Sequence, residues 1–456
     1  MSVKEGLYKN KRFFKIIIFI IFISAVLALV NEITKAKFIG DSTTIVDGFY
    51  AEKENSIDLI VIGSSNSFCT INPLVLYENY GICAYDFGSS SQPMNISALY
   101  LKEALKSQKP KVVALEVNMM VGDSINSGYE AGLRWGLTDM PFSIDKCKCV
   151  YQSIGKIDAD FFSYIFPVFR YHNRWKELSK TDYVYMSEDK TNYTKGYLET
   201  QQLVDRTLNF EQYSSEGEAW IDEKNLVYLD EMLQICQENN IELMLFKSPK
   251  ENWHKYETEA IRQIAAQREL EFVDYNELFF NHEIELDIAQ DFRDGDHLND
   301  YGAEKISVHF GKYLQQKYQL PDRRNGNTKN SWDEACFYKQ RSGWQEFMAA
   351  TTAKECLEMI QDDENYVIIV TDSKDGMDDV EQWVYENKQI VFNHKWAENN
   401  IWHTDIGDSE LVLSKLGGVY QVLIDGIEHY KADARWNIVV YDKITQTVVA
   451  NLSYAT

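Results

Sequence analysis

A serine follows a short apolar run near residue 60, and an aspartate and a histidine follow roughly 230 residues later. The apolar run covers 57–62, and the turn after it begins at Gly63 and carries Ser65. The later segment carries Asp294 and His297, three residues apart. A serine hydroxyl becomes a nucleophile when a histidine accepts its proton and an aspartate holds that histidine in one tautomer. We therefore expect Ser65, His297 and Asp294 to form a triad for acyl transfer.

Other residue assignments are open at this point. Ser64 and Ser67 are rival nucleophiles by proximity alone. The backbone N–H of Ser65 is an expected oxyanion donor, because the turn after a parallel strand is where such sheets place ligands. A lone histidine before a helix is commonly a capping or surface residue, and His297 differs through its neighbour Asp294.

A calcium loop is the rival interpretation of the acidic segment that contains Asp291, Asp294, Asp296 and Asp300. The segment lacks the alternation of an EF-hand and its closing glutamate. We therefore expect neither a metal nor another cofactor.

Strand-like and helix-like segments alternate around these residues. Apolar runs typical of buried strands cover 57–62, 112–117, 241–246 and 271–273, and helical spacing covers 98–107, 226–239, 258–268 and 301–316. This alternation predicts an α/β fold, with a parallel sheet covered by helices on both faces.

The N-terminus carries an apolar segment of about 18 residues, near the lower limit for crossing a bilayer. Residues 16–30 contain no charge, and five basic residues precede them or begin the segment. The positive-inside rule predicts a single-pass anchor with residues 1–31 as cytoplasmic N-terminus and span, and the rest extracytoplasmic. A cleaved signal peptide is the alternative, with Ser24, Ala25 and Ala28 near the end of the run.

Three further segments follow from composition. Residues 32–56 are predicted to be a polar stalk. Residues 121–225 are rich in aromatic side chains and interrupt the strand–helix rhythm, so we interpret them as an insertion over the catalytic end of a domain that covers 57–320. A breaker-rich linker then leads to a small β-rich or α+β domain at 332–456.

Bulk charge excludes one class of partner. The formal net charge is −24, so the phosphates of nucleic acid would repel the chain. The seven cysteines are odd in number and irregularly spaced, which favours mostly free, buried thiols over a disulfide framework or a zinc cluster.

Three blocks of this sequence resemble the SGNH/GDSL hydrolase superfamily, over roughly residues 57–318. They are Gly63-Ser64-Ser65, Gly88-Ser89-Ser90-Ser91-Gln92 and Asp294-Gly295-Asp296-His297-Leu298-Asn299. The Gly-Ser-Ser form is similar to that of the membrane-anchored bacterial branch, which includes the teichoic acid D-alanyl-transfer protein and polysaccharide O-acetyltransferases. The resemblance implies a three-layer α/β/α sandwich with Ser65 as nucleophile and Asp294 and His297 as its partners.

The same resemblance implies an oxyanion hole but leaves its members open. The glycine of the second block usually stands where this chain has Ser91, and Gly88 is the alternative match. The family has a further block that carries an asparagine, and Asn118, in Leu115-Glu116-Val117-Asn118, is its weak counterpart. The expected oxyanion donors are therefore Ser65, Gly88, Ser91 and Asn118.

The expected function is extracytoplasmic acyl transfer or ester hydrolysis on a cell-envelope polysaccharide, with an acetyl or D-alanyl group. A transferase would need a multipass membrane partner that supplies the acyl group. The alternatives are a catalytically inactive scaffold that binds wall glycans or an export complex, and a secreted carbohydrate esterase. The C-terminal segment is also similar, through 436–442, to an interleukin-like EMT-inducer type domain, which implies carbohydrate or protein binding.

Overall fold

The computed structural model describes residues 3–35, 42–122, 130–178, 182–183, 190–200, 202–204, 206–326, 329–342, 346–350, 352–360, 365–372, 390–392, 400–407, 409–416, 419–429 and 436–454. The chain divides into two compact units, Met1–Ala335 and Cys336–Thr456. The division falls inside helix α15 (Lys329–Ser342), a few residues after the boundary that the linker composition predicts.

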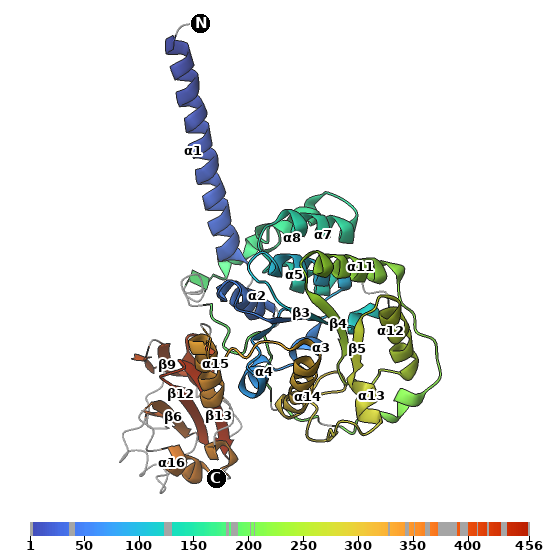
Figure 1. The fold of residues 1–456 in the computed structure, drawn as a ribbon. Coiled ribbons are helices and arrows are strands. Elements are labelled where there is room, and N and C mark those ends of the chain that lie inside the picture. The colour runs from blue at the N-terminus through green and yellow to red at the C-terminus, as the bar shows by residue number, and fades with distance from the viewer. Residues whose placement is uncertain are drawn as a thin grey trace. The chain divides into compact units, whose positions relative to one another are not determined.

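The first element is the long helix α1 (Val3–Thr34), drawn in dark blue in Figure 1. Its segment Phe13–Thr34 has a mean hydropathy of 3.0 over its most apolar window and is long enough to cross a membrane. Length and composition fit a membrane span and a signal sequence equally. Its apolar side chains from Phe13 to Val30 are largely exposed, as a lipid-facing helix requires.

The segment predicted as a polar stalk forms helix α2 (Ser42–Ala51) instead over ten of its residues. Ile45, Val46 and Phe49 of this helix are buried in the core of the first unit. The three apolar residues recur at helical spacing. The polar residues around them led the sequence analysis to predict a stalk instead of a helix.

The centre of the first unit is a five-stranded sheet in the order β2-β1-β3-β4-β5, and all its pairs are parallel. The strands are β1 (Leu59–Ile62), β2 (Ala84–Asp86), β3 (Val112–Glu116), β4 (Glu242–Lys247) and β5 (Glu271–Asp274). The α/β prediction is confirmed, and β2 is a strand that the sequence analysis missed because it has only three residues.

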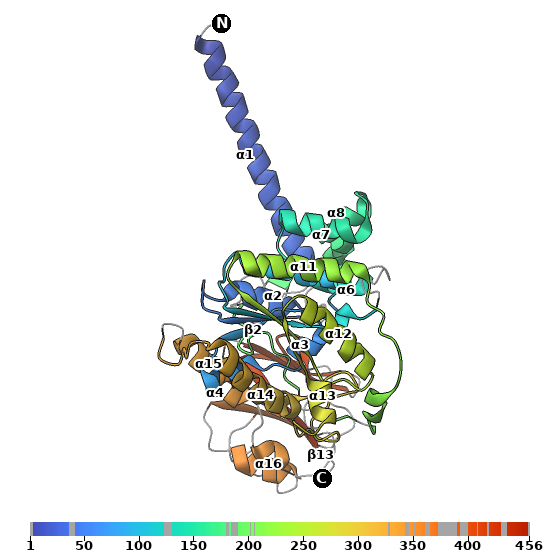
Figure 2. The same cartoon turned by 45° about the vertical axis from the view of Figure 1, so that its right-hand side comes forward.

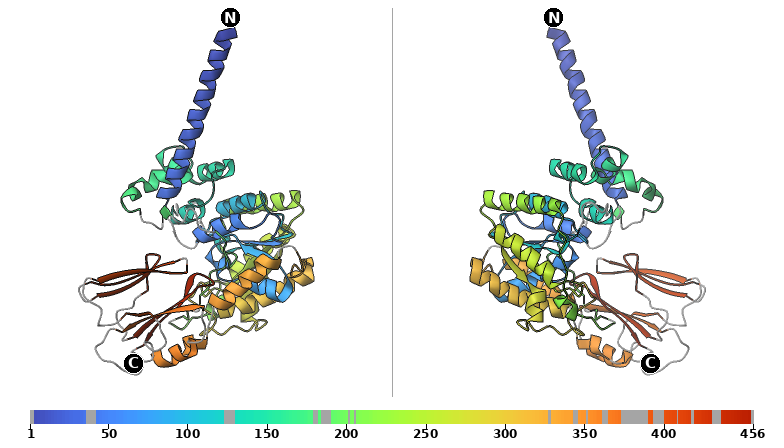
Figure 3. Two further views of the ribbon diagram at one scale, coloured as in Figure 1. Left: turned by 90° about the vertical axis from the view of Figure 1, so that its left-hand side faces the viewer. Right: turned by 90° about the vertical axis from the view of Figure 1, so that its right-hand side faces the viewer.

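Helices cover both faces of this sheet (Figures 1 and 2). Alternate residues of each strand point to opposite cores, as the pleat requires. On one face, Ile60 and Leu245 pack with α2, α5 (Met94–Ala104), α11 (Glu223–Glu238) and α12 (Lys255–Gln267). On the other, Val61 and Phe246 pack with α4 (Pro73–Tyr80), α13 (Tyr275–Phe280) and α14 (Asp300–Tyr318). Figure 3 shows yellow-green α11 and orange-gold α14 on opposite sides of the sheet.

The aromatic-rich insertion divides into two parts. Its helices α6 (Glu130–Leu137), α7 (Ile144–Ile154), α8 (Ala159–Ile165) and α9 (Val168–Tyr171) contact α5 and α1. Helix α6 reaches the carboxyl edge of the sheet, since a Cβ on Gly136 would lie 3.0 Å from Ser89 Oγ in the turn after β2, while α7 packs on α5 and α9 on α1. The part after residue 190 also reaches that edge, because the Leu198 N–H donates to the Phe68 carbonyl of helix α3 (Ser65–Phe68).

The second unit is rich in strands and largely antiparallel. One sheet has the order β13-β12-β6-β7, with β13 (Thr447–Tyr454), β12 (Trp436–Asp442), β6 (Tyr366–Asp372) and β7 (Ile390–Phe392). The other has the order β11-β10-β9-β8, with β11 (Ile427–Glu428), β10 (Val419–Ile424), β9 (Ser409–Leu416) and β8 (Asn400–Ile406). Val439 shares a core with Leu411 between the sheets, and Val440 packs on the other side with α16 (Ala353–Ile360).

Candidate active site

The order of the strands predicts a ligand-binding crevice beside Ser65. The chain leaves β1 toward β2 on one side and continues to β3 on the other, so the strand order reverses between β1 and β3. Ligands of such sheets bind outside the carboxyl ends of the strands at this reversal. Ser65 begins α3 directly after β1, and Asn118 begins the short helix η1 (Asn118–Met120) directly after β3.

A long segment after β5 carries His297 back to this crevice. The chain leaves β5 at the far edge of the sheet, and the later helix α14 packs against α4, which follows β1 in the chain. The segment between them must therefore cross the carboxyl edge. It is tied to α3 by the Asn66 amide, which donates to the Asp296 carbonyl at 2.6 Å. A turn closed by the Arg293 N–H and the His297 carbonyl holds the histidine, at 3.0 Å.

The three side chains predicted to form a triad meet at this place. His297 Nε2 lies 2.8 Å from Ser65 Oγ. His297 Nδ1 lies 2.9 and 3.1 Å from the two oxygens of Asp294. In the tautomer that this pattern favours, Nδ1–H donates to the carboxylate and Nε2 accepts from the serine hydroxyl. The arrangement has a nucleophile, its base and the group that orients the base.

The neighbouring serines have other environments. Ser67 is fully buried, and its hydroxyl donates to the Ser64 carbonyl at 2.8 Å. Ser64 is also buried, with 2% of its surface exposed. Ser65 is partly exposed and bonded to His297, so it is the serine of the three that a substrate can reach.

The Asp294 carboxyl is strongly biased toward its charged form. Partial burial raises the pKa of this group, but the hydrogen bond from His297 and the charge of the imidazolium outweigh it. The pKa of Asp294 is therefore well below its ordinary value of 3.8. Asp294 also accepts from the Asp296 N–H at 2.8 Å, and an ionised carboxylate is the state that holds the imidazole in place.

The two expected donors from the second sequence block lie in the turn after β2. A Cβ atom on Gly88 would lie 2.5 Å from the Gly63 carbonyl oxygen, so the close approach of the β1 and β2 turns requires glycine at residue 88. Ser91 adopts a φ of +49°, the left-handed conformation that favours glycine. The backbone shape expected of a glycine in this block is thus present, at a strain cost of order 1 kcal/mol.

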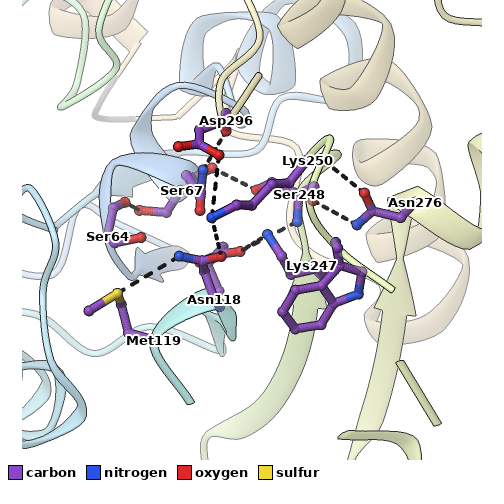
Figure 4. Close-up of polar contacts among 12 residues, drawn as sticks. Ser64, Ser67, Asn118, Met119, Lys247, Ser248, Lys250, Asn276 and Asp296 are labelled. Carbon is purple, nitrogen blue, oxygen red and sulfur yellow. Dashed lines mark hydrogen bonds and ion pairs between the residues drawn. The ribbon is translucent and has the colours of Figure 1, made fainter. Parts of the chain in front are cut away.

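Asn118 belongs to a polar network at the mouth of the crevice (Figure 4). Lys250 Nζ lies 3.5 Å from Asn118 Oδ1 and 3.3 Å from Asp296 Oδ1, so one ammonium joins the end of β3 to the histidine-bearing turn. Because the lysine holds the amide oxygen, the amide nitrogen is directed elsewhere, and it lies 3.8 Å from Met119 Sδ. The Asn118 side-chain N–H is thus directed toward the Met119 sulfur, and to serve as an oxyanion donor it would have to leave this contact.

A buried ion pair lies beneath this network and was missed by the sequence analysis. Lys247 Nζ lies 2.9 Å from Glu116 Oε1, and both side chains are fully buried. The second carboxylate oxygen accepts from the Asn118 N–H at 3.0 Å. Burial lowers the pKa of the Lys247 ammonium, and the Glu116 carboxylate opposes that effect. A charge at the last position of each of two apolar strands was the sequence signal that could have revealed the pair.

The calcium interpretation has no support in the geometry. Asp291 pairs with Lys305 at 2.6 Å, Asp300 accepts from the Tyr197 hydroxyl at 2.8 Å, and Asp294 binds His297. The four carboxylates are therefore directed to different partners. Among the residues that the structure describes, no group of three metal-ligating side chains converges.

None of the seven cysteines, all of which lie in the described part of the chain, forms a disulfide, and five of them are buried.

Comparison with known proteins gives no family for this chain: no family model matches it, and no curated protein matches it significantly.

Proposed function

We propose that this protein is an SGNH-type serine enzyme that is anchored in the membrane and transfers or removes an acyl group on a cell-envelope polysaccharide outside the cell. The observation that carries the proposal is the contact of Ser65 Oγ with His297 Nε2 at 2.8 Å, with Asp294 behind the imidazole. The acyl group is acetyl or D-alanyl, and the acceptor is a sugar hydroxyl or water.

The proposed reaction uses these residues in two half-reactions. Ser65 Oγ attacks the acyl carbonyl while His297 Nε2 takes its proton, and the imidazolium then protonates the leaving group. A sugar hydroxyl or a water molecule attacks the acyl-enzyme in the second half, with His297 again as base. The expected oxyanion donors are the N–H of Ser65, which as the first residue of α3 has no intrahelical acceptor, the N–H of Gly88 or Ser91, and the Asn118 amide.

The superfamily assignment is supported by the places of the three sequence blocks. Each block follows a strand or precedes a helix at the carboxyl edge of one parallel sheet, and Ser65 and Asn118 flank the reversal of strand order. The proposal that α1 stays in the mature protein is supported by its last residues. The Asn31 side chain accepts from the Val168 N–H at 3.0 Å, and Lys35 pairs with Asp139 at 3.1 Å, so the folded unit uses residues just beyond the apolar segment.

The test is labelling of the full-length protein by a fluorophosphonate, together with hydrolysis of an aryl acetate. We expect the wild type to react and Ser65→Ala to lose labelling and at least about 1000-fold of the hydrolysis rate. Ser214→Ala, which changes an exposed serine of η3 (Glu211–Ser214), is the matched control and is expected to keep both. Labelling that survives Ser65→Ala would refute the nucleophile, and no labelling of the folded wild type would favour the inactive scaffold.

A further inference from the structure

The insertion helices expose a contiguous group of phenylalanines, which we call the aromatic cluster: Phe142, Phe162, Phe166 and Phe169. Their exposed fractions are 65%, 44%, 38% and 59%. The rings contact one another, with centroids 5.8 Å apart for Phe142 and Phe166 and 6.3 Å apart for Phe166 and Phe169. Single exposed apolar side chains are ordinary, but a contiguous patch indicates an interaction surface.

The aromatic cluster lies where α1 enters the folded unit. The Val168 N–H, one residue from Phe169, donates to Asn31 Oδ1 at 3.0 Å. Arg174 donates to the carbonyl groups of Thr34 and Lys35 at 3.1 and 2.5 Å, and these carbonyls end α1. Figures 1 and 2 both show α7 and α8 beside the lower end of α1. The cluster therefore continues from the exposed apolar surface of the helix, which extends to Val30.

Charge does not explain this surface. Arg170 pairs with Glu130 at 2.8 Å and Lys156 pairs with Asp158 at 2.9 Å, whereas the Lys176 ammonium lies 5.6 Å from the centroid of the Trp175 ring. An anionic partner would therefore gain little from the two paired cations. The cluster instead offers phenylalanine rings next to a membrane-length helix, and Phe is among the apolar residues that interfacial helices bury at the boundary between headgroups and acyl chains. Trp175, which is 64% exposed and directly follows Arg174, adds the residue type that favours this boundary.

We propose that the aromatic cluster and Trp175 insert into the outer interfacial layer of the same bilayer that α1 spans. The inference rests on α1 being retained as an anchor and is independent of the catalytic assignment. A second attachment beside the span restricts the tilt of the first unit, so that its distance from the lipid surface is fixed. Because the attachment is apolar, it does not depend on anionic lipid or on salt.

The first test replaces Phe169 or Phe142 by the photocrosslinker p-benzoylphenylalanine in the full-length protein, reconstituted in phosphatidylcholine vesicles. We expect lipid adducts at both positions by mass spectrometry, in similar yield when anionic lipid is added. Phe280 on α13, which is 46% exposed, is the matched control and is expected to give none. Absence of lipid adducts at residues 142 and 169, or adducts to a second copy of this chain, would overturn the proposal. The same holds if crosslinking in the source membranes gives mainly adducts to another protein.

A second measurement leaves the cluster intact. In vesicles that contain brominated phosphatidylcholine, we expect Trp175→Phe to lower the fraction of tryptophan fluorescence that the bromines quench, by removing a lipid-exposed indole. An unchanged quenched fraction places Trp175 outside the lipid and contradicts the proposal. A carbonate wash is the control. If the wild type and Trp175→Phe both stay in the vesicles after the wash, the change in quenching does not come from loss of the α1 span.

Discussion

The chemistry proposed here depends on the environments of three side chains more than on their identities. Ser65 is distinguished from its neighbours Ser64 and Ser67 by partial exposure and by the imidazole at 2.8 Å. His297 is distinguished by a carboxylate whose pKa is held well below the ordinary value. The residue types alone would have allowed several other combinations.

At this scale we expect Asp294→Asn to lower kcat for an aryl acetate by roughly 1000-fold to 10,000-fold with little change in KM. The amide removes the negative charge that stabilises the imidazolium and can present a donor to Nδ1, which favours the wrong tautomer. Stopped-flow kinetics on the purified full-length protein provide the measurement. Asp322→Asn changes an exposed carboxylate that pairs with Arg324 outside the site, and a comparable loss there would contradict the specific role of Asp294.

The elements of the first unit hold the site through charges at the ends of strands. Glu116 ends β3 and Lys247 ends β4, and these neighbouring strands bring the two together in the interior. A buried ion pair contributes little net stability, but removing one partner leaves the other charge unpaired. The pair also reaches the site, since Glu116 accepts from the Asn118 N–H.

We therefore expect Glu116→Gln to lower the free energy of unfolding by roughly 3–5 kcal/mol, measured by urea denaturation. The double variant Glu116→Gln with Lys247→Met is expected to recover most of that loss, because no buried charge remains. Glu277→Gln breaks a more exposed pair with Arg262, and this control is expected to cost less than about 1 kcal/mol. If Glu116→Gln lowers the free energy of unfolding by as little as Glu277→Gln does, an unpaired buried charge at Lys247 is not the cause of the destabilisation.

Helix α7 contains a second buried cation whose effect depends on pH. Burial lowers the pKa of Lys146 to about 8 from 10.5, and Asp139 opposes the shift. The ammonium donates to the Met140 carbonyl at 2.7 Å. Between pH 8 and 10.5 the folded chain gives up this proton while the unfolded chain keeps it, so stability rises with pH over this window. This gain in folding stability is lost again as the pH falls through 8, where the folded chain takes the proton back.

Lys146→Met is therefore expected to be more stable than the wild type at pH 7, by up to roughly 3 kcal/mol, since 2.5 units of pKa are worth that amount. The lost hydrogen bond to Met140 offsets part of the gain. The difference between the two proteins is expected to shrink toward pH 10, which chemical denaturation at several pH values measures. A difference that stays constant from pH 7 to pH 10 would exclude burial of the charge as its cause.

At the scale of the whole molecule, the first unit depends on both ends of its sequence. Asn31, Thr34 and Lys35 at the end of α1 bond to the insertion. Trp332 of α15 is fully buried, and its ring lies 5.3 Å from that of Tyr77. The segments that connect the five-stranded sheet to α1 and to the second unit thus also belong to the packed part of the first unit.

We expect the mature protein from its source membranes to retain residues 1–31. A cut within the apolar segment would remove the helix that presents Asn31 and Thr34 to the insertion. Intact-mass analysis, with peptide mapping of the N-terminus, checks this expectation. A mature N-terminus near residue 30 would favour the secreted esterase, and it would also remove the span on which the membrane attachment of the aromatic cluster depends.

The sequence by itself determined the local parts of this protein: the apolar N-terminal helix, the strands β1, β3, β4 and β5, and the candidates Ser65, Asp294 and His297. These features depend on composition, hydrophobic periodicity and residues close together in the chain. Only the tertiary structure decided that the segment after β5 returns across the sheet to bring His297 to Ser65, and that Glu116 meets Lys247. It also showed that the segment expected to be a stalk contributes a core helix and that α9 contacts α1. Such contacts join residues far apart in the chain, and they follow from how apolar faces are buried against one another, which local patterns do not encode.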